Sequence, residues 1–284
     1  MRIAMFQGPA ASDVAGSLDE VAAAAADAAA RGAEILVCAE LTCTGYREHR
    51  TAEPRPDDGP RGPIATAMAQ AARDAGLAIA YGYSELDQTD DVLLHNSVAV
   101  IGRGGDVLAH YRKTHLYRPT GGADGSPDDR PFVPGTDLVV QFPLGGLTCG
   151  VLICYDVEFP EAVRAHALAG TDWLLVPTAL AHPDTQVATV LVPARAIESQ
   201  MFVTYVNRVG TEHRDDAGNR DGGGAPVVYC GLSCTVGPDG VELSRAGDVP
   251  VVLVTDLDPE RLAASRRRNP YLRDRRVDLY RGPS

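Results

Sequence analysis

Apolar runs alternate with longer amphipathic segments along the first half of the chain. Short apolar runs between turn residues are typical of buried strands, whereas apolar residues spaced three and four apart are typical of helices. Gly32 and Gly76 follow two amphipathic segments and are expected to end them. The pattern predicts strands at 2–6, 34–39 and 77–83, helices at 18–31 and 64–75, and a hairpin of 95–101 with 107–111.

The second half of the chain repeats this rhythm. It predicts strands at 147–154, 173–177, 202–208 and 251–256, helices at 160–169 and 187–200, and a late hairpin of 232–236 with 241–244. Strand–helix alternation with some antiparallel pairs favours a layered α/β architecture. No linker or repeat marks a boundary, so we predict that residues 1–284 form a single domain. The Gly/Asp/Pro-rich loops 54–63, 120–134 and 212–226 are expected to be functional rims or lids.

Composition and charge exclude several classes of protein. The chain is 45% hydrophobic and 23% charged, which is typical of globular proteins, and its net charge of −12 argues against nucleic-acid binding. The arginines from Arg266 to Arg276 are expected to form structural salt bridges. No apolar stretch resembles a signal peptide or a membrane span. We therefore predict no membrane partner and a cytoplasmic protein whose six cysteines are reduced.

Three chemically active residues each follow a different predicted strand. Cys154 ends the run TCGVLIC, Glu40 follows EILVCA, and Lys113 follows the first hairpin. Each has an ordinary alternative role: a core thiol for Cys154, a salt-bridging carboxylate for Glu40, and a solvated edge lysine for Lys113. Because strand ends meet at one edge of a sheet, the three together favour a catalytic site.

Each of the three residue types has a possible role in the chemistry of such a site. A thiol attacks a substrate carbon only as the thiolate, so Cys154 needs a base or a positive neighbour. Glu40 can serve as the general base, and the ammonium of Lys113 can stabilise a developing oxyanion. A Cys–His pair is the competing arrangement. His115 is the nearest histidine candidate, and its alternative role is to fix a loop.

Three segments carry a family likeness. AELTCTGY, YRKTHLY and GVLICYDVEFPE, in that order, resemble the signature segments of the nitrilase, or carbon–nitrogen hydrolase, superfamily. The likeness continues in VPTA, PARAIESQMFVTYVNR and PYLRDRRVDLY, and so covers nearly the whole chain. It implies a four-layer α-β-β-α sandwich of the nitrilase type. It also implies oligomers, a homodimer or larger, formed through the segment after Cys154 and the C-terminal tail from about residue 258.

The resemblance also implies a mechanism. In a Glu-Lys-Cys triad, Glu40 takes the thiol proton, Cys154 attacks the amide carbon, and Lys113 supports the oxyanion. The backbone N–H of Tyr155 would be the second oxyanion donor. A water molecule activated through Glu40 would then hydrolyse the thioester. The resemblance implies no metal and no organic cofactor, so the amide and water are the expected small-molecule partners.

The residues after the nucleophile favour one branch of the superfamily. Nitrilases usually carry Trp-Glu after the cysteine, whereas Tyr155 and Asp156 look more like the amidase and carbamoylase branches. The expected activity is hydrolysis of a small aliphatic amide to a carboxylic acid and ammonia. Alternatives are an N-carbamoyl amine or amino acid hydrolase, a nitrilase, and an acyltransferase. A different class of alternative is a catalytically silent ligand-binding or scaffold protein on the same fold.

Several further residues are candidates for bracing the site or contacting substrate. Many family members carry a second glutamate before the F-x-PG segment, but this chain has none between Lys113 and Gly135. Asp128, in SPDDRPFVPG, stands nearest that place, with loop capping as its alternative role. Tyr46 is expected either to wall the pocket or to pack, and the loops at Thr178 and Asn207 are expected to select substrate. Glu198 is expected to fix Arg195.

Overall fold

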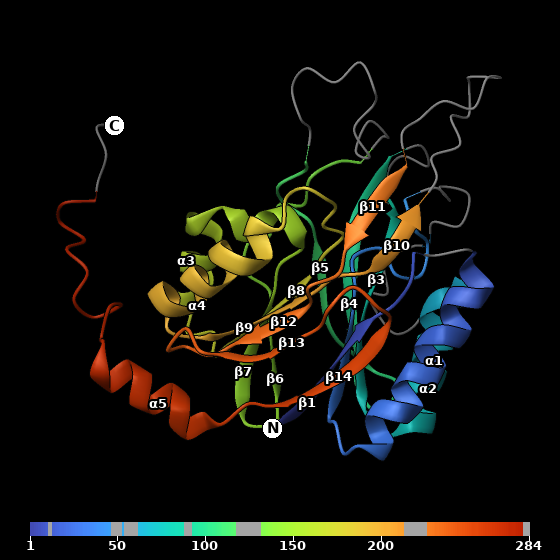
Figure 1. The fold of residues 1–284 in the computed structure, drawn as a ribbon, viewed down its shortest axis with the longest axis horizontal. Coiled ribbons are helices and arrows are strands. Elements are labelled where there is room, and N and C mark those ends of the chain that lie inside the picture. Colours follow the sequence, from blue (N-terminus) through green and yellow to red (C-terminus); the bar gives the residue numbers. More distant parts are fainter. Residues whose placement is uncertain are drawn as a thin grey trace.

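Two six-stranded sheets form the centre of the computed structural model of the chain (Figure 1). The structure describes residues 1–10, 13–46, 53, 62–87, 93–117, 132–212 and 226–280. Three of the predicted loop segments, 54–63, 120–134 and 212–226, fall largely outside these residues. The helices lie on the outer faces of the two sheets, which gives the layer order α-β-β-α (Figure 1). The predicted four-layer sandwich is confirmed.

The first sheet has the order β14-β1-β2-β3-β4-β5. Strands β1, β2 and β3 run parallel, while β4, β5 and β14 are antiparallel to their neighbours. The predicted hairpin is therefore confirmed as β4–β5. The strand bounds are β1 Arg2–Gln7, β2 Ile35–Cys38, β3 Ala78–Leu86, β4 Leu94–Ile101, β5 Val107–Arg112 and β14 Val251–Asp256.

The second sheet has the order β13-β12-β9-β8-β7-β6, with β7, β8 and β9 parallel. Its strands are β6 Gln141–Leu144, β7 Leu147–Val151, β8 Trp173–Pro177, β9 Phe202–Val206, β12 Cys234–Val236 and β13 Glu242–Arg245. A separate two-stranded ribbon, β10 (Val209–Glu212) with β11 (Val227–Cys230), stands beyond its edge. Strands β2 and β5 of the first sheet and β7 of the second each precede one of the three candidate residues.

Residue alternation explains why residues 3–6 of β1 and all of β2 are apolar. Ile3 and Met5 face the core between the two sheets, whereas Ala4 and Phe6 face the core under the helices. The same alternation holds in β2, so each strand is buried on both faces.

Helices α1 and α2 cover the first sheet. Helix α1 spans Val14–Ala30 and begins earlier than the predicted 18–31, because the Asp13 side chain accepts a hydrogen bond from the Gly16 N–H at 2.8 Å. Helix α2 spans Gly62–Ala75. Gly32 and Gly76 have positive φ values of +78° and +70°, which glycine adopts without a steric cost, and they end the two helices as predicted.

Helices α3 and α4 cover the second sheet. Helix α3 spans Pro160–Leu168. The predicted helix 187–200 has two parts, a π-helical turn at Val187–Leu191 and helix α4 at Val192–Ser199. Arg195 and Glu198 in α4 form the predicted ion pair at 3.0 Å. No helix among the described residues is both long and apolar enough to cross a membrane.

A fifth helix, α5 (Pro259–Arg268), precedes the C-terminal segment, which runs away from the second sheet (Figure 1). Arg266 pairs with Asp172 at 2.8 Å, and Arg273 and Arg276 pair with neighbouring aspartates. The predicted salt bridges are therefore confirmed for Arg266, Arg273 and Arg276. The role of the tail in a subunit interface stays a prediction.

Candidate active site

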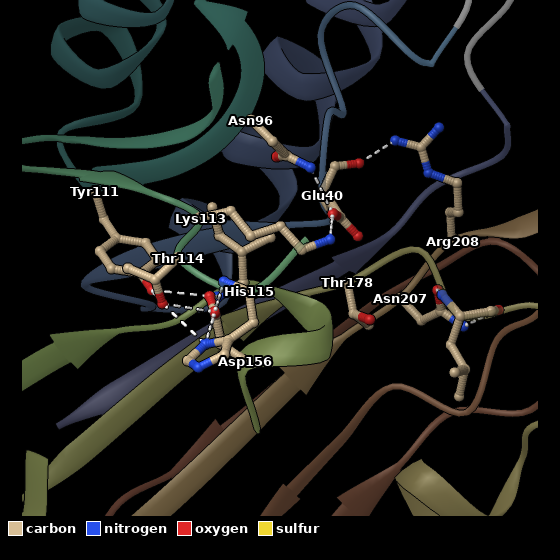
Figure 2. A network of polar contacts seen from close by, with 12 residues as sticks. Glu40, Asn96, Tyr111, Lys113, Thr114, His115, Asp156, Thr178, Asn207 and Arg208 are labelled. Atoms are coloured by element: carbon tan, nitrogen blue, oxygen red, sulfur yellow. Dashed lines mark hydrogen bonds and ion pairs between the residues drawn. The ribbon is translucent and has the colours of Figure 1, made fainter. Parts of the chain in front are cut away.

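Glu40 and Lys113 lie next to each other where two strands of the first sheet end (Figure 2), and Cys154 follows β7 of the second sheet. Glu40 follows β2, and Lys113 directly follows β5. Cys154 differs from the prediction, since β7 ends at Val151 and Cys154 begins a short 3₁₀ helix, Cys154–Glu158. The structure thus brings residues distant in sequence to the place where the two sheets meet.

Glu40 and Lys113 form a buried ion pair. The Lys113 Nζ donates to Glu40 Oε1 at 2.8 Å, and both side chains are almost wholly excluded from solvent. The Asn96 amide donates to the same oxygen at 2.7 Å (Figure 2). The other oxygen, Glu40 Oε2, has no hydrogen-bond partner among the described residues. A carboxylate anchored through one oxygen keeps the second available for proton transfer.

The backbone around Glu40 is held from three sides. The Glu40 N–H donates to the Thr178 carbonyl at 3.2 Å, and the Arg208 guanidinium donates to the Glu40 carbonyl. The Cys43 N–H donates to the Gly82 carbonyl of β3 at 3.0 Å. A Cβ at Gly82 would overlap the Leu41 amide nitrogen, so only glycine lets β3 pass this close to the turn.

Cys154 sits at a strained backbone position. Its φ of +47° lies in the left-handed region that residues other than glycine rarely adopt, and such strain is common at functional sites. Cys154 is half-buried, whereas the other five cysteines are buried, and all six carry free thiols. Burial and the charge of Glu40 raise the pKa of the Cys154 thiol to about 12, although Lys113 acts in the opposite direction. The resting thiol is therefore protonated at neutral pH and needs a base in order to attack.

Asp156 connects the nucleophile turn to the Lys113 loop. Its Oδ2 accepts hydrogen bonds from the Ile153 N–H at 3.0 Å and the Tyr111 hydroxyl at 2.8 Å. Its Oδ1 accepts from the Thr114 hydroxyl at 2.9 Å and the His115 N–H at 2.8 Å, and the His115 Nδ1 also lies 2.8 Å away. His115 thus contacts Asp156, as expected for a residue that fixes a loop.

The other sequence candidates have different surroundings. The Thr178 hydroxyl donates to the Tyr205 hydroxyl at 2.9 Å. Asn207 acts as a brace: its Oδ1 accepts from the Leu180 N–H at 2.9 Å, and its Nδ2 donates to the Gly231 carbonyl at 2.8 Å. Tyr46 packs against a small apolar cluster that includes Phe132. Asp128 lies outside the described residues.

Sequence reasoning missed Asn96 and Arg208. Asn96 lies near the start of β4, LHNSVAVI, between His95 and Ser97, and the sequence signal for its role is a polar residue within a strand that is buried throughout. Arg208 is also buried, and its guanidinium lies 5.3 Å from the centre of the Tyr229 ring as well as contacting Glu40. Arg208 falls within the family-like segment from Pro193, but its spacing alone gives no reason to place it beside Glu40.

Comparisons with known proteins agree along nearly the whole chain. The model of the carbon–nitrogen hydrolase family matches residues 2–267. A hydrolase of Pseudomonas protegens, encoded in the pqqF 5' region, is 38% identical over 99% of this chain and 90% of its own length. An (R)-stereoselective amidase of a Pseudomonas species is 33% identical over 98% of this chain and 91% of its own length.

Solved structures of an amidase from Nesterenkonia sp. share the fold. One has a TM-score of 0.79 at 34% identity and covers 99% of this chain and 95% of the amidase chain. Variants of that amidase were solved with acrylamide and with butyramide, and another shows the product of Michael addition of acrylamide at its active-site cysteine.

Proposed function

Because the chain belongs to the carbon–nitrogen hydrolase family and is an amide-acting enzyme, we propose that it hydrolyses a small aliphatic amide through a thioester on Cys154. The observation that carries this proposal is the buried Glu40–Lys113 pair beside a half-buried thiol. The charges of Glu40 and Lys113 both act on the pKa of Cys154, as expected of groups that share one site.

Acylation begins with proton transfer. Glu40 Oε2 takes the proton from the Cys154 thiol as Sγ forms a bond to the amide carbon, and the carbonyl electrons move onto oxygen. Lys113 Nζ and the Tyr155 N–H stabilise this oxyanion, since donors fixed in a water-poor site need no reorganisation. Glu40 then gives its proton to the amide nitrogen, the carbon–nitrogen bond breaks, and ammonia leaves.

Deacylation repeats these roles with water as the nucleophile. Glu40 accepts a proton from water as the water oxygen attacks the thioester carbon. The same two donors stabilise the second oxyanion. Its collapse breaks the carbon–sulfur bond, the thiolate recovers the proton from Glu40, and the carboxylic acid departs. One carboxylate thus acts alternately as base and acid in both halves of the reaction.

The acyl group is inferred from the relatives and from the aromatic residues that follow the nucleophile in the chain. Acrylamide and butyramide are small primary amides that occupy variants of the Nesterenkonia amidase, and we extend that substrate class to this chain. The aromatic rings of Tyr155, Tyr117 and Phe159 pack edge to face next to Cys154, with centroid separations of 5.3 Å and 4.9 Å. Such an apolar wall suits a short alkyl chain rather than a charged group.

The test is turnover of a panel of small amides, N-carbamoyl amines and nitriles, followed by ammonia release and by intact mass. Wild type is expected to release ammonia from the amides and to carry the matching acyl mass on Cys154. Cys154→Ala and Lys113→Met are expected to abolish turnover. Cys149→Ala is the matched control, because Cys149 is a buried thiol of β7 with its pKa also raised to about 12.

Four outcomes would contradict the proposal. Turnover of nitriles but not amides would overturn the substrate class, and so would hydrolysis of the N-carbamoyl amines alone. Undiminished turnover by Cys154→Ala would overturn the mechanism. Absence of both turnover and acyl adducts in wild type would favour a catalytically silent binding protein.

We also propose that the protein is a homo-oligomer. The segment after α5 carries exposed apolar side chains, among them Tyr271, Leu279 and Tyr280, which are 45–66% accessible in the single chain. Burying such side chains against a second copy removes apolar surface from water. Light scattering should give at least twice the mass of one chain, and a protein that stays monomeric at micromolar concentration would contradict this proposal.

A further inference from the structure

Asp156 is a fully buried carboxylate bound by donors from two separate segments (Figure 2). One segment is the turn that carries Cys154 and Tyr155. The other is the stretch that carries Lys113. Burying a charge is costly unless hydrogen-bond donors compensate it, and here both carboxylate oxygens accept hydrogen bonds. The five contacts are those of Ile153 N, Tyr111 Oη, Thr114 Oγ1, His115 N and His115 Nδ1.

The contact with Ile153 fixes the nucleophile turn. The Ile153 N–H donates to Asp156 Oδ2 at 3.0 Å, and the Asp156 N–H donates back to the Ile153 carbonyl at 3.0 Å. These two bonds close a ring around Cys154 and Tyr155. The strained φ of Cys154 is held within this ring. The direction of the Tyr155 N–H is therefore set by Asp156.

The remaining contacts of Asp156 are with residues on both sides of Lys113 in the sequence. Tyr111 lies two residues before Lys113, while Thr114 and His115 follow it directly. The Tyr111 and Thr114 hydroxyls lie 3.1 Å from each other as well as bonding to Asp156. The His115 ring is also stacked on Phe159, with 4.1 Å between the ring centres. The segment that presents the Lys113 ammonium is thus bound to the same carboxylate as the nucleophile turn.

We infer that Asp156 is a positioning residue that sets the spacing of the two oxyanion donors, Lys113 Nζ and the Tyr155 N–H. The inference rests on the proposed function, which assigns those two groups to the oxyanion. Asp156 has no solvent exposure, so it acts through its neighbours rather than on the substrate. Oxyanion donors must be aligned to within a fraction of an ångström, and a misplacement of about 1 Å can cost about 100-fold in rate.

Asp156→Asn tests this role with little change in shape. The asparagine amide has one acceptor oxygen, and its NH₂ group would face either the Ile153 N–H and Tyr111 or Thr114 and His115. Either the Ile153 N–H of the nucleophile turn or the His115 N–H of the Lys113 segment therefore loses its acceptor. We expect kcat to fall about 100-fold with KM nearly unchanged, because the lost alignment matters in the transition state.

A second measurement separates oxyanion alignment from general damage. Methyl methanethiosulfonate reacts with a thiol without forming an oxyanion on carbon, so its reaction with Cys154 needs only the thiol and its base. We expect Asp156→Asn to retain most of this rate while losing turnover. Thr114→Val should lower kcat about tenfold, since it removes one bond to a charged group, and Thr114→Ser should restore it.

Asp172→Asn is the matched control. Asp172 also accepts a backbone N–H, from Thr148 at 3.0 Å, and it also binds a donor from a distant segment, Arg266. It precedes β8, at the opposite end of that strand from Thr178. Its loss should lower the melting temperature and leave kcat unchanged.

The outcomes distinguish this inference from the function on which it rests. Wild type that hydrolyses no amide in the panel would refute the proposed function. An active wild type with an equally active Asp156→Asn variant would refute the positioning role alone. Parallel losses of turnover, thiosulfonate reactivity and melting temperature would also refute it, because they indicate a merely structural carboxylate.

Discussion

Glu40 holds its two carboxylate oxygens in different environments. Oε1 accepts from Lys113 and Asn96, while Oε2 has no partner among the described residues. The anchored oxygen fixes the rotamer, and the second oxygen is left to exchange protons. This asymmetry lets one residue serve as both an electrostatic partner of Lys113 and a general base.

Glu40→Gln should separate those two roles. The glutamine oxygen can still accept from Lys113, but the side chain cannot take a proton. We expect kcat/KM for amides to fall roughly 10²- to 10⁴-fold, the usual contribution of a general base, and the melting temperature to fall because the buried Lys113 ammonium loses its counter-charge. Initial rates and thermal unfolding measure the two effects. Glu34→Gln, a carboxylate on the outer surface, is the control and should keep full activity; comparable rates for both variants would exclude Glu40 as the base.

At this scale the sequence predicts the residues at the ends of apolar runs better than those that reach the site from elsewhere in the chain. Glu40, Lys113 and Cys154 could be predicted because each follows an apolar run and belongs to a recognisable segment. Asn96 and Arg208 contact Glu40 from other strands, and such contacts depend on strand register, which the local pattern does not specify. The five contacts of Asp156 likewise form only when two segments distant in sequence meet in space.

At the scale of elements, the close approach of β3 determines where the turn that carries Glu40 lies. The Gly82 carbonyl accepts from Cys43, and a Cβ at Gly82 would lie 2.9 Å from the Ala39 carbonyl oxygen and 3.0 Å from the Glu40 carbonyl carbon. Backbone atoms cannot rotate out of the way as side chains do. The position of the general base is therefore coupled to a residue on a neighbouring strand.

Gly82→Ala should displace the Glu40 turn. We expect amide turnover to fall at least about tenfold, since a displacement of a fraction of an ångström at a catalytic group has effects of that order. Steady-state kinetics would measure the loss. Gly247→Ala is the control, because a Cβ there meets nothing within 4 Å and should leave kcat unchanged. A Gly82→Ala variant with wild-type kcat would show that the turn tolerates the shift.

Some elements differ from the prediction because local hydrogen bonds or single residues outweigh the pattern of apolar positions. Strand β7 ends before Cys154 because the Asp156 carboxylate captures the Ile153 N–H and starts a 3₁₀ turn. Strand β6 was overlooked because Pro143 argues against a strand, although it is tolerated at this sheet edge. Helix α5 was overlooked because its interior face buries only Leu262 and Ser265. An Arg-rich helix with so narrow a buried face carries a weak periodic signal.

At the scale of the whole molecule, burial affects many groups that ionise at high pH. Burial raises the pKa of Cys149, Cys154 and Cys234 to about 12 from an ordinary value of 9.0. It also raises the pKa values of Tyr81 and Tyr205 well above their ordinary range. The folded chain therefore keeps protons that the unfolded chain releases.

The fold should lose stability at alkaline pH. The stabilisation from these thiols is fully present below about pH 9, and it is lost as the pH rises toward about 12, because the unfolded chain binds fewer protons in that interval. Each group adds up to about 1.4 kcal/mol per pH unit to the decline in the free energy of unfolding. Urea unfolding from pH 7 to 11 measures it. Cys234→Ala should show a shallower decline than wild type, and a flat profile in wild type would contradict the expectation.

The pairing of β1 with β14 has a consequence for synthesis. Residues 2–7 lie between β2 and residues 251–256, so β1 is flanked on one side by a strand that is synthesised much later. While the nascent chain leaves the ribosome, the outer edge of β1 has no neighbour, and an open strand edge invites pairing with other chains. A truncated transcript, or proteolysis before Val251, would leave this edge of β1 permanently unpaired. Quality control of this enzyme therefore depends on β14, although β14 carries none of the proposed catalytic residues.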